Sequence, residues 1–193
     1  MEYLIKEQNY AIRKLESSEY DFALLSKWRS DERVSPYFGG RDKDNSPEAI
    51  RKKYLPRIEG KTRITPCIAE IDEKPSAYIQ YYTFTEEMYK THGLSDFQNA
   101  FGIDIFLFPD AGMGKGIGRN ILRLMCYYLF NEKNADIVEI CPRKVNARAV
   151  RAYLGAGFRF HSELEKGEFF EGKWFEEYVM IMTSPVEKES IFI

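Results

Sequence analysis

The spacing of hydrophobic and polar residues along the chain predicts a succession of strands and helices. Alternating or continuous apolar runs predict strands at residues 10–15, 65–71, 77–83, 101–108, 137–141, 158–164 and 174–182. Apolar residues three or four positions apart predict helices at residues 20–28, 47–54, 117–129 and 147–153. Residues 86–99 are polar and show no clear period, so no element is assigned to them.

Residues with strong positional preferences fix several of these boundaries. Ser46 followed by Pro47 is typical of a helix start, because Ser caps free N–H groups and Pro fits the first turn. Asn146 predicts a second cap, and Gly157 predicts the end of that helix. The run at residues 101–108 is almost continuously apolar, which predicts a strand in the middle of a sheet.

The order of these elements indicates the fold class. Helices interspersed among strands predict an α/β or α+β fold built on one mixed sheet. The sequence contains no internal repeat, low-complexity segment or linker, so we expect residues 1–193 to form a single domain. Within it, residues 1–9 and 185–193 are expected to be peripheral, with the tail after Ser184 loosely held.

Composition and charge narrow the class of protein. The 44% hydrophobic and 30% charged residues are typical of a soluble globular chain. A formal net charge of −2 argues against a general nucleic-acid binder. There is no apolar run of about 18 residues for a membrane helix, and the first residues lack the pattern of a signal peptide. We therefore expect a cytoplasmic protein with neither a nucleic-acid nor a membrane partner.

The cysteines and histidines predict no metal site. Cys67, Cys126 and Cys141 are an odd number and show no metal-ligand spacing, and the chain has only 2 His. Three free thiols in a reducing compartment are the simplest interpretation.

The most distinctive motif is the glycine-bearing loop at residues 112–118, which leads into the predicted helix at residues 117–129. A helix N-terminus offers free N–H groups and partial positive charge, and glycines allow the backbone to close on an anion. Lys115 and Arg119 add cationic side chains, which suits a pyrophosphate. The motif is neither a Walker loop nor a complete dinucleotide fingerprint. A plain glycine-rich turn is the alternative.

Asp104 interrupts the apolar strand at residues 101–108. A buried carboxylate needs a partner or its pKa rises, and either state suits proton chemistry or the binding of a cationic amine. An aspartate at a sheet bulge or in a structural salt bridge is the alternative.

Several other polar and aromatic residues have both a functional and a structural interpretation. Tyr153 lies on a predicted helix and is either a site residue or a core residue, while Asn146 is first of all a cap. Trp28 and Tyr37 either line a substrate site or serve ordinary packing. A third group is either a solvated loop or a binding patch for a polycation: Glu163, Glu165, Glu168 and Glu171.

Two of these motifs together resemble the GNAT superfamily of acyl-CoA N-acyltransferases. Residues 114–118 resemble its coenzyme A pyrophosphate loop, and residues 146–158 resemble its Asn…Ala…Tyr…Gly-Phe signature. The resemblance covers nearly the whole chain. It implies a central mixed, mostly antiparallel sheet flanked by helices and split between its two central parallel strands. It also implies acetyl-CoA as co-substrate and no metal.

The resemblance implies where coenzyme A would bind. Backbone groups of residues 106–108 would pair with the pantetheine arm, and one N–H would polarise the thioester carbonyl. The family often has Gln or Arg where this chain has Met113, which removes one phosphate contact. The implied cofactor-binding residues are Phe106, Leu107, Phe108, Met113, Gly114, Lys115, Gly116, Ile117, Gly118, Arg119, Asn146 and Ala149.

A narrower resemblance concerns the acceptor. Residues 28–34, 37–43 and 102–104 resemble aminoglycoside 6'-N-acetyltransferases, including the acetylating half of bifunctional resistance enzymes. By that resemblance Asp104 would engage the amine as base or holder, and Tyr153 would protonate the departing thiolate. The implied acceptor contacts are Trp28, Tyr37, Asp104 and Cys141. The chain departs from this pattern at Ile105, where Gln is typical, and at Cys141, where Asp is typical.

Three functions follow from these residues. The first is acetylation of an aminoglycoside 6'-amine by direct transfer in a ternary complex, with the chain acting as a monomer or homodimer. The second is acylation of another small amine, such as a polyamine, an amino sugar or a siderophore precursor, which the departures at Ile105 and Cys141 favour. The third is a non-catalytic module that binds coenzyme A.

Overall fold

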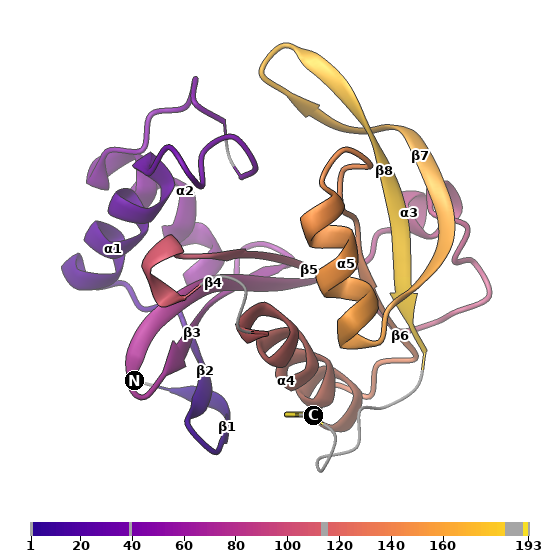
Figure 1. Cartoon of the computed structure of the whole chain (residues 1–193), viewed down its shortest axis with the longest axis horizontal. Helices are drawn as coiled ribbons and strands as arrows, with labels where there is room; N and C mark the ends of the chain where they lie inside the picture. Colours follow the sequence, from indigo (N-terminus) through magenta and orange to yellow (C-terminus); the bar gives the residue numbers. More distant parts are fainter. Residues whose placement is uncertain (1, 39, 113–115, 184–190, 193) are drawn as a thin grey trace. The chain divides into compact units, whose positions relative to one another are not determined.

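The computed structural model describes residues 2–38, 40–112, 116–183 and 191–192 (Figure 1). Its strands are β1 (Tyr3–Glu7), β2 (Tyr10–Lys14), β3 (Ile64–Ile71), β4 (Lys74–Thr83), β5 (Ala100–Leu107), β6 (Ile137–Ile140), β7 (Arg159–Phe170) and β8 (Lys173–Met182). Its helices are α1 (Glu19–Ser30), α2 (Pro47–Ile58), α3 (Glu86–Thr91), α4 (Ile117–Glu132) and α5 (Ala147–Ala156). A short 3-10 turn, Pro109–Ala111, follows β5.

The strands form one eight-stranded mixed sheet in the order β1-β2-β3-β4-β5-β6-β8-β7. β5 and β6 are parallel, whereas β1–β2, β2–β3, β6–β8 and β7–β8 are antiparallel. The register of the parallel pair ends where Gly102 lies opposite Glu139, although β5 continues to Leu107. The predicted mixed sheet flanked by helices is therefore confirmed, with β5 in its interior and a divergence of the two parallel strands beyond Gly102.

The chain divides into two compact units, residues 1–81 with 105–115 and residues 82–104 with 116–193. In the first unit, α1 and α2 pack against each other and α2 packs on β3. Both predicted helix starts are confirmed by capping bonds, from Asp21 N–H to Ser18 Oγ and from Ala49 N–H to Ser46 Oγ. The core of this unit is formed by Leu15, Phe22, Leu25, Trp28, Val34, Ile50, Tyr54, Ile68, Tyr78 and Phe106.

A buried ionic network joins β2, α1 and β3 in the first unit. Arg13, 1% exposed, donates from Nη1 and Nη2 to both carboxylate oxygens of Asp21, at 2.7 and 2.8 Å. Its Nε donates to Glu70 Oε1 at 2.7 Å, and Asp21 and Glu70 are also buried. One guanidinium thus neutralises part of the charge of two carboxylates that have little access to water.

In the second unit, α4 and α5 lie side by side (Figure 1). The apolar face of α4, which includes Ile121 and Leu124, is buried. Arg123 extends from α4 to the last turn of α5, where its Nε donates to the Ala156 carbonyl and its Nη2 to the Gly155 carbonyl. These bonds satisfy carbonyls that a helix C-terminus leaves open and fix the position of α5 against α4.

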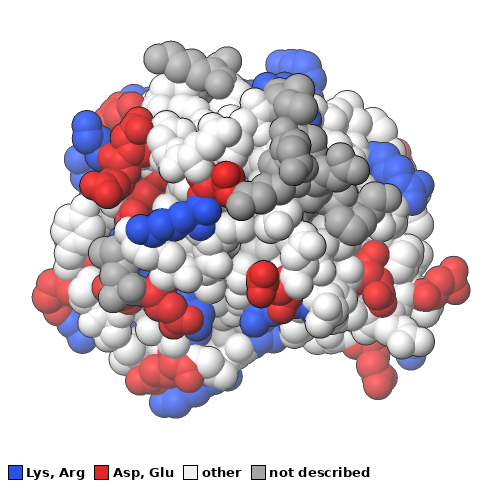
Figure 2. All heavy atoms as spheres, turned by 90° about the horizontal axis from the view of Figure 1, so that it is seen from below, with Lys and Arg blue, Asp and Glu red and all other residues white. Residues whose placement is uncertain are grey.

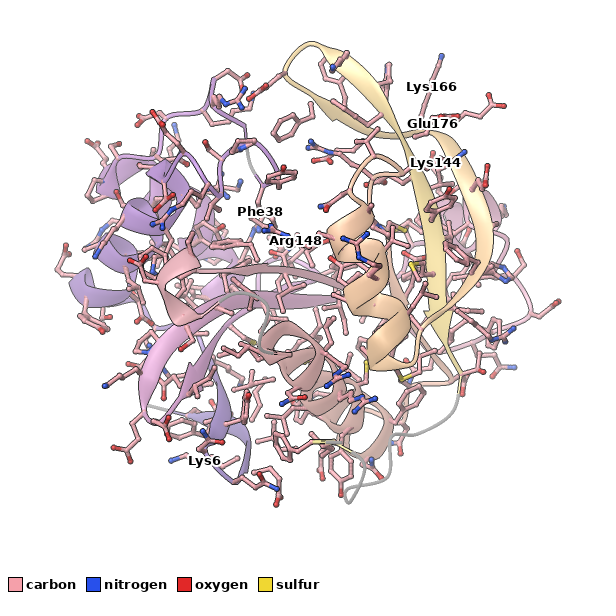
Figure 3. All side chains as sticks on the ribbon, viewed as in Figure 1. Lys6, Phe38, Lys144, Arg148, Lys166 and Glu176 are labelled. Atoms are coloured by element: carbon pink, nitrogen blue, oxygen red, sulfur yellow. The ribbon has the colours of Figure 1, made fainter. Side chains whose placement is uncertain are left out.

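The β7–β8 hairpin corrects the expectation of an acidic loop. Glu163, Glu165 and Glu168 lie within β7, and only Glu171 lies in the turn. Lys144, labelled in Figure 3, ties the segment after β6 to this hairpin through Glu163 Oε2 at 2.5 Å and Glu176 Oε1 at 3.5 Å. Charged and apolar residues alternate near the end of the chain because they belong to a long antiparallel hairpin with one solvent-exposed face.

Two segments form elements that the sequence did not predict. Residues 3–7 form the edge strand β1, and residues 86–91 form α3, whose start is capped by Thr85 Oγ1. At the C-terminus, Ile191 is fully buried, whereas residues 184–190 and 193 lie outside the described residues, so the expectation of a loosely held tail stays a prediction. Short polar segments carry little periodicity, so pairing and packing with distant residues decided their structure.

In the part of the chain that the structure describes, none of the helices is long and apolar enough to cross a membrane. Figure 2 shows Lys and Arg side chains interspersed with Asp and Glu on the face that it presents. This mixture accords with the formal net charge of −2.

Candidate active site

The start of α4 has the features of an anion site. Gly116 is the N-cap residue and has φ +77°, a conformation that favours glycine. A Cβ there would lie 3.3 Å from Arg119 Nη2. No described side chain caps this helix, and Arg119 Nε is buried without a hydrogen-bond partner among the described residues. An oxyanion ligand would satisfy both the open N–H groups and this nitrogen.

The sequence-predicted phosphate loop is only partly described. Gly116, Ile117, Gly118 and Arg119 form the cap and first turn of α4. Met113, Gly114 and Lys115 lie outside the described residues. Their predicted contacts with a cofactor stay predictions.

α5 begins and ends as the sequence predicts. Asn146 Oδ1 accepts from the N–H of Ala149 at 3.1 Å, so Asn146 acts as the predicted cap. Gly157 ends the helix with φ +112°. Tyr153 lies on this helix, and its ring centroid is 6.4 Å from that of Phe158. The predicted cofactor contacts of Asn146 and Ala149 stay predictions.

Four side chains from separate elements of the second unit influence one another electrostatically. Asp104 lies on β5, beyond the last residue paired with β6, and Cys141 follows β6. Tyr153 comes from α5 and Glu177 from β8. The charge of Asp104 acts on all three of the others, so we call these four residues the Asp104 cluster.

The cluster keeps its other members in their protonated forms. Burial raises the pKa of the Tyr153 phenol, and the charge of Asp104 raises it further. Burial likewise raises the pKa of the Cys141 thiol well above its usual value, with additional effects from Glu139 and Glu177. Asp104 is therefore the charged member of the cluster, and its carboxylate would stabilise a cation bound there.

Sequence reasoning missed Glu177. Burial, followed by the charges of Glu168 and Asp104, raises the pKa of this carboxyl to about 8. Gly167 on β7 makes room for it, because a Cβ at that position would lie 2.5 Å from Glu177 Oε2. In the sequence, Glu177 is one of several charged residues near the end of the chain. Only the pairing of β8 with β6 and β7 brings it within electrostatic reach of Asp104 and Cys141.

Sequence reasoning also missed Glu139 and His92. Glu139 is fully buried in β6, where its Oε2 lies 2.6 Å from His92 Nδ1 and its Oε1 accepts from Cys141 Sγ at 3.3 Å. His92 is the C-cap residue of α3, the helix that the sequence analysis did not predict. A polar residue two positions before Cys141 on an apolar strand is the one signal in the sequence that pointed to this group.

Trp28 and Tyr37, the predicted acceptor residues of the first unit, differ in how far they are exposed. Trp28 is 1% exposed, with its ring stacked on Phe108 at 5.4 Å and edge-on to Phe106 at 6.2 Å. The Trp28 surface is used in packing against residues at the end of β5, and its predicted contact with an acceptor stays a prediction. Tyr37 is 54% exposed, and its predicted acceptor contact also stays a prediction. The backbone contacts predicted for residues 106–108 stay predictions.

The groups gathered in the second unit can perform proton chemistry on an amine. Asp104 is a carboxylate at a divergence of parallel strands, and Tyr153 is a phenol kept protonated nearby. Acyl transfer to the nitrogen of a cationic amine requires a base that receives the amine proton and a donor for the leaving group. The Asp104 carboxylate and the Tyr153 hydroxyl are groups of these two kinds.

Comparisons with known proteins identify the family of the chain. Residues 17–166 match the family model described as an acetyltransferase (GNAT) domain. The chain is 28% identical over 141 residues to an aminoglycoside N(6')-acetyltransferase type 1 of Klebsiella pneumoniae, covering 73% of this chain and 70% of the relative.

Solved structures share the fold. AAC(6')-Ib in complex with ribostamycin and coenzyme A has a TM-score of 0.73 at 23% identity, covering 91% of this chain and 94% of that one. A ribosomal-protein-S5-alanine acetyltransferase of Vibrio fischeri also has a TM-score of 0.73, at 16% identity, covering 95% of this chain and 98% of that one. The family model spans most of the chain and includes the Asp104 cluster except Glu177, so the chain belongs to the GNAT acetyltransferase domain family.

Proposed function

We propose that this protein is an acetyl-CoA-dependent N-acetyltransferase that acts on a primary amine of a small cationic acceptor, first of all the 6'-amine of an aminoglycoside. The observation that carries the proposal is the Asp104 cluster, a protonated phenol and two acidic groups beside the divergence of β5 and β6. Transfer would be direct, within a ternary complex of protein, acetyl-CoA and amine.

The residues at the start of α4 fit coenzyme A. The open N–H groups after Gly116 and the buried, unpaired Arg119 Nε suit the pyrophosphate, which carries negative charge and accepts hydrogen bonds. Backbone groups of residues 106–108 and the side chain of Asn146 would hold the pantetheine arm. When bound, acetyl-CoA supplies the activated acetyl group.

Asp104 would accept a proton from the acceptor ammonium, directly or through one water, because only the neutral amine carries the lone pair that attacks. The neutral amine then attacks, so that a C–N bond forms as the C–S bond of the thioester breaks. The acylated nitrogen loses a second proton to solvent and the departing thiolate takes up a proton from solvent, so one proton is released per turnover. Tyr153 would donate a hydrogen bond to that sulfur. Since the pKa of the phenol is raised, a hydrogen bond to the thiolate is more favourable than complete transfer of the phenolic proton.

The cationic acceptor is supported by the acids around Cys141. The aminoglycoside acetyltransferase pattern that this sequence resembles has Asp at the position of Cys141. Glu139 and Glu177 both act electrostatically on that thiol. A bound ammonium group would favour the ionised form of Glu177, and the resulting carboxylate would in turn stabilise the ammonium group. Glu177 of β8 would thus supply the acid that this chain lacks at position 141.

A second candidate is acetylation of another small polyamine or amino sugar. Ile105 departs from the aminoglycoside pattern, and a neighbour of equal TM-score carries the name of a protein acetyltransferase, so the fold itself selects no acceptor. Both candidates share the donor, the reaction and the role of Asp104.

Thiol release from acetyl-CoA, measured across aminoglycosides, linear polyamines, amino sugars and an alanine-terminated peptide, tests the proposal. We expect the highest kcat/KM with aminoglycosides and a product acetylated at the 6'-amine by NMR. Turnover restricted to polyamines or amino sugars would establish the second candidate instead. Binding of coenzyme A without thiol release from any amine would contradict an enzyme and leave the non-catalytic module.

We expect Tyr153→Phe to lower kcat by about 10- to 100-fold, because the departing thiolate loses its hydrogen-bond donor. Coenzyme A affinity, measured by calorimetry, should stay nearly constant. Tyr20→Phe is the matched control, since it removes the hydroxyl of a tyrosine that is 62% exposed. If affinity for coenzyme A collapses instead while the single-turnover rate is kept, Tyr153 is a packing residue.

A further inference from the structure

Three side chains with metal-binding atoms of different kinds converge at Cys141, which is also a member of the Asp104 cluster. His92 Nδ1, a carboxylate oxygen of Glu139 and Cys141 Sγ all lie within 4.8 Å of one another. They come from the end of α3, from β6 and from the residue that follows β6. We propose that His92, Glu139 and Cys141 form a binding site for one Zn²⁺ ion.

The separations are close to those of a zinc site. Glu139 holds the group together, with Oε2 2.6 Å from His92 Nδ1 and Oε1 3.3 Å from Cys141 Sγ. In tetrahedral zinc with Zn–N and Zn–O near 2.0 Å and Zn–S near 2.3 Å, neighbouring ligand atoms are roughly 3.3–3.5 Å apart. Side-chain rotations that move the ligand atoms by about one ångström or less would bring the three atoms onto one ion.

The charges balance when the ion binds. Zn²⁺ replaces the two hydrogen bonds that link Glu139 to its neighbours. Cys141 releases its thiol proton to solvent, and the imidazole of His92 carries its one proton on Nε2 while Nδ1 coordinates the ion. His92 coordinates as the neutral imidazole. One carboxylate and one thiolate then neutralise the two positive charges of the ion, and this matters because Glu139 is fully buried.

The ligand set selects the kind of metal. Thiolate and imidazole favour Zn²⁺ over Mg²⁺ and Ca²⁺, which prefer several oxygen ligands. Three protein ligands leave a fourth tetrahedral position for water.

The ligands are held by the surrounding structure. Ser162 Oγ on β7 donates to the His92 carbonyl at 3.0 Å, and the Phe84 ring lies edge-on to the imidazole at 5.7 Å. Glu139 is fixed by the pairing of β6 with β5 and β8. Rigid supports of this kind reduce the reorganisation that metal binding requires.

Titration of the reduced, metal-free protein with Co²⁺, a spectroscopic substitute for Zn²⁺, tests the site. We expect about one Co²⁺ per chain, a near-ultraviolet thiolate-to-cobalt charge-transfer band, and loss of that band when Zn²⁺ is added. Cys141→Ser should abolish the band. His92→Gln should weaken binding at least about 100-fold, because the loss of even an outer-shell partner typically costs 10- to 100-fold.

The chain offers matched controls. Cys126→Ser removes a thiol that is buried elsewhere, and His161→Gln removes the other histidine. Both should bind Co²⁺ as the original protein does. In the unmodified chain, saturating Zn²⁺ should also slow alkylation of Cys141, the one cysteine of the three that is not fully buried.

Absence of a charge-transfer band, a band that survives Cys141→Ser, or alkylation unchanged by Zn²⁺ would each overturn the zinc site and leave a hydrogen-bond network. The alkylation measurement decides the question even if Cys141→Ser fails to fold. All readouts report metal binding rather than acetyl transfer, so the inference stands or falls separately from the proposed function.

Discussion

Asp104→Asn is expected to lower kcat/KM for acetyl transfer by about 100-fold or more. The substitution preserves the size of the side chain but removes the group that accepts the ammonium proton, and general-base contributions are typically 10²- to 10⁴-fold. It also removes the negative charge that acts on Cys141, Tyr153 and Glu177. Coenzyme A affinity should change little, so the loss should be found in kcat and in acceptor KM.

Asp96→Asn is the control for this experiment. Asp96 is exposed and lies in the segment before β5, in the same unit of the structure. Its substitution changes the formal charge by the same amount without touching the Asp104 cluster, so kinetic constants should be kept. Near-normal turnover by Asp104→Asn would remove Asp104 from the role of base and transfer that role to Glu177 or to solvent.

Arg13→Met is expected to destabilise the protein by about 3–5 kcal/mol, the usual loss when one partner of a buried ionic group is removed. The guanidinium makes its bonds at 2.7–2.8 Å to Asp21 and Glu70, and all three residues are buried. Without Arg13, two carboxylates stay in the core with no cation to balance them. Urea unfolding measured at neutral pH reports the change.

Two further variants separate charge from packing. Adding Asp21→Asn and Glu70→Gln to Arg13→Met removes both stranded charges and should recover part of the loss. Arg33→Met is the matched control. Like Arg13, Arg33 forms ion pairs with two carboxylates, those of Asp31 and Asp110, but the Arg33 side chain is 52% exposed. Water solvates these carboxylates when the arginine is gone, so no resolvable change is expected. A loss as large for Arg33 as for Arg13 would contradict the role of burial.

The sequence was most informative where local rules act. The caps at Ser46 and Asn146 and the left-handed Gly157 are confirmed, because capping depends on neighbouring backbone groups alone. The interior position of β5 is also confirmed, since an almost continuously apolar run has to be covered on both faces. Helix α3 was missed because its six residues are stabilised by a cap and by tertiary contacts rather than by an apolar face of their own.

Trp28 shows what local sequence patterns cannot predict. An aromatic residue next to a family-like motif suggested a substrate wall, yet its ring is used to support Phe106 and Phe108. A hydrophobic pattern identifies a side chain that prefers to leave water, but it does not tell whether protein or ligand will cover it.

What the sequence by itself determined is the fold class, the family and the identity of Asp104 and Tyr153 as candidates, because these depend on periodicity and on short motifs. Only the tertiary structure decided which side chains surround Asp104. Glu177 is separated from it by 73 positions, and Glu139 and His92 meet only because β6 lies in the sheet while α3 ends beside it. Electrostatic interactions depend on distance in space, and the chain order carries no record of that distance until the strands have paired.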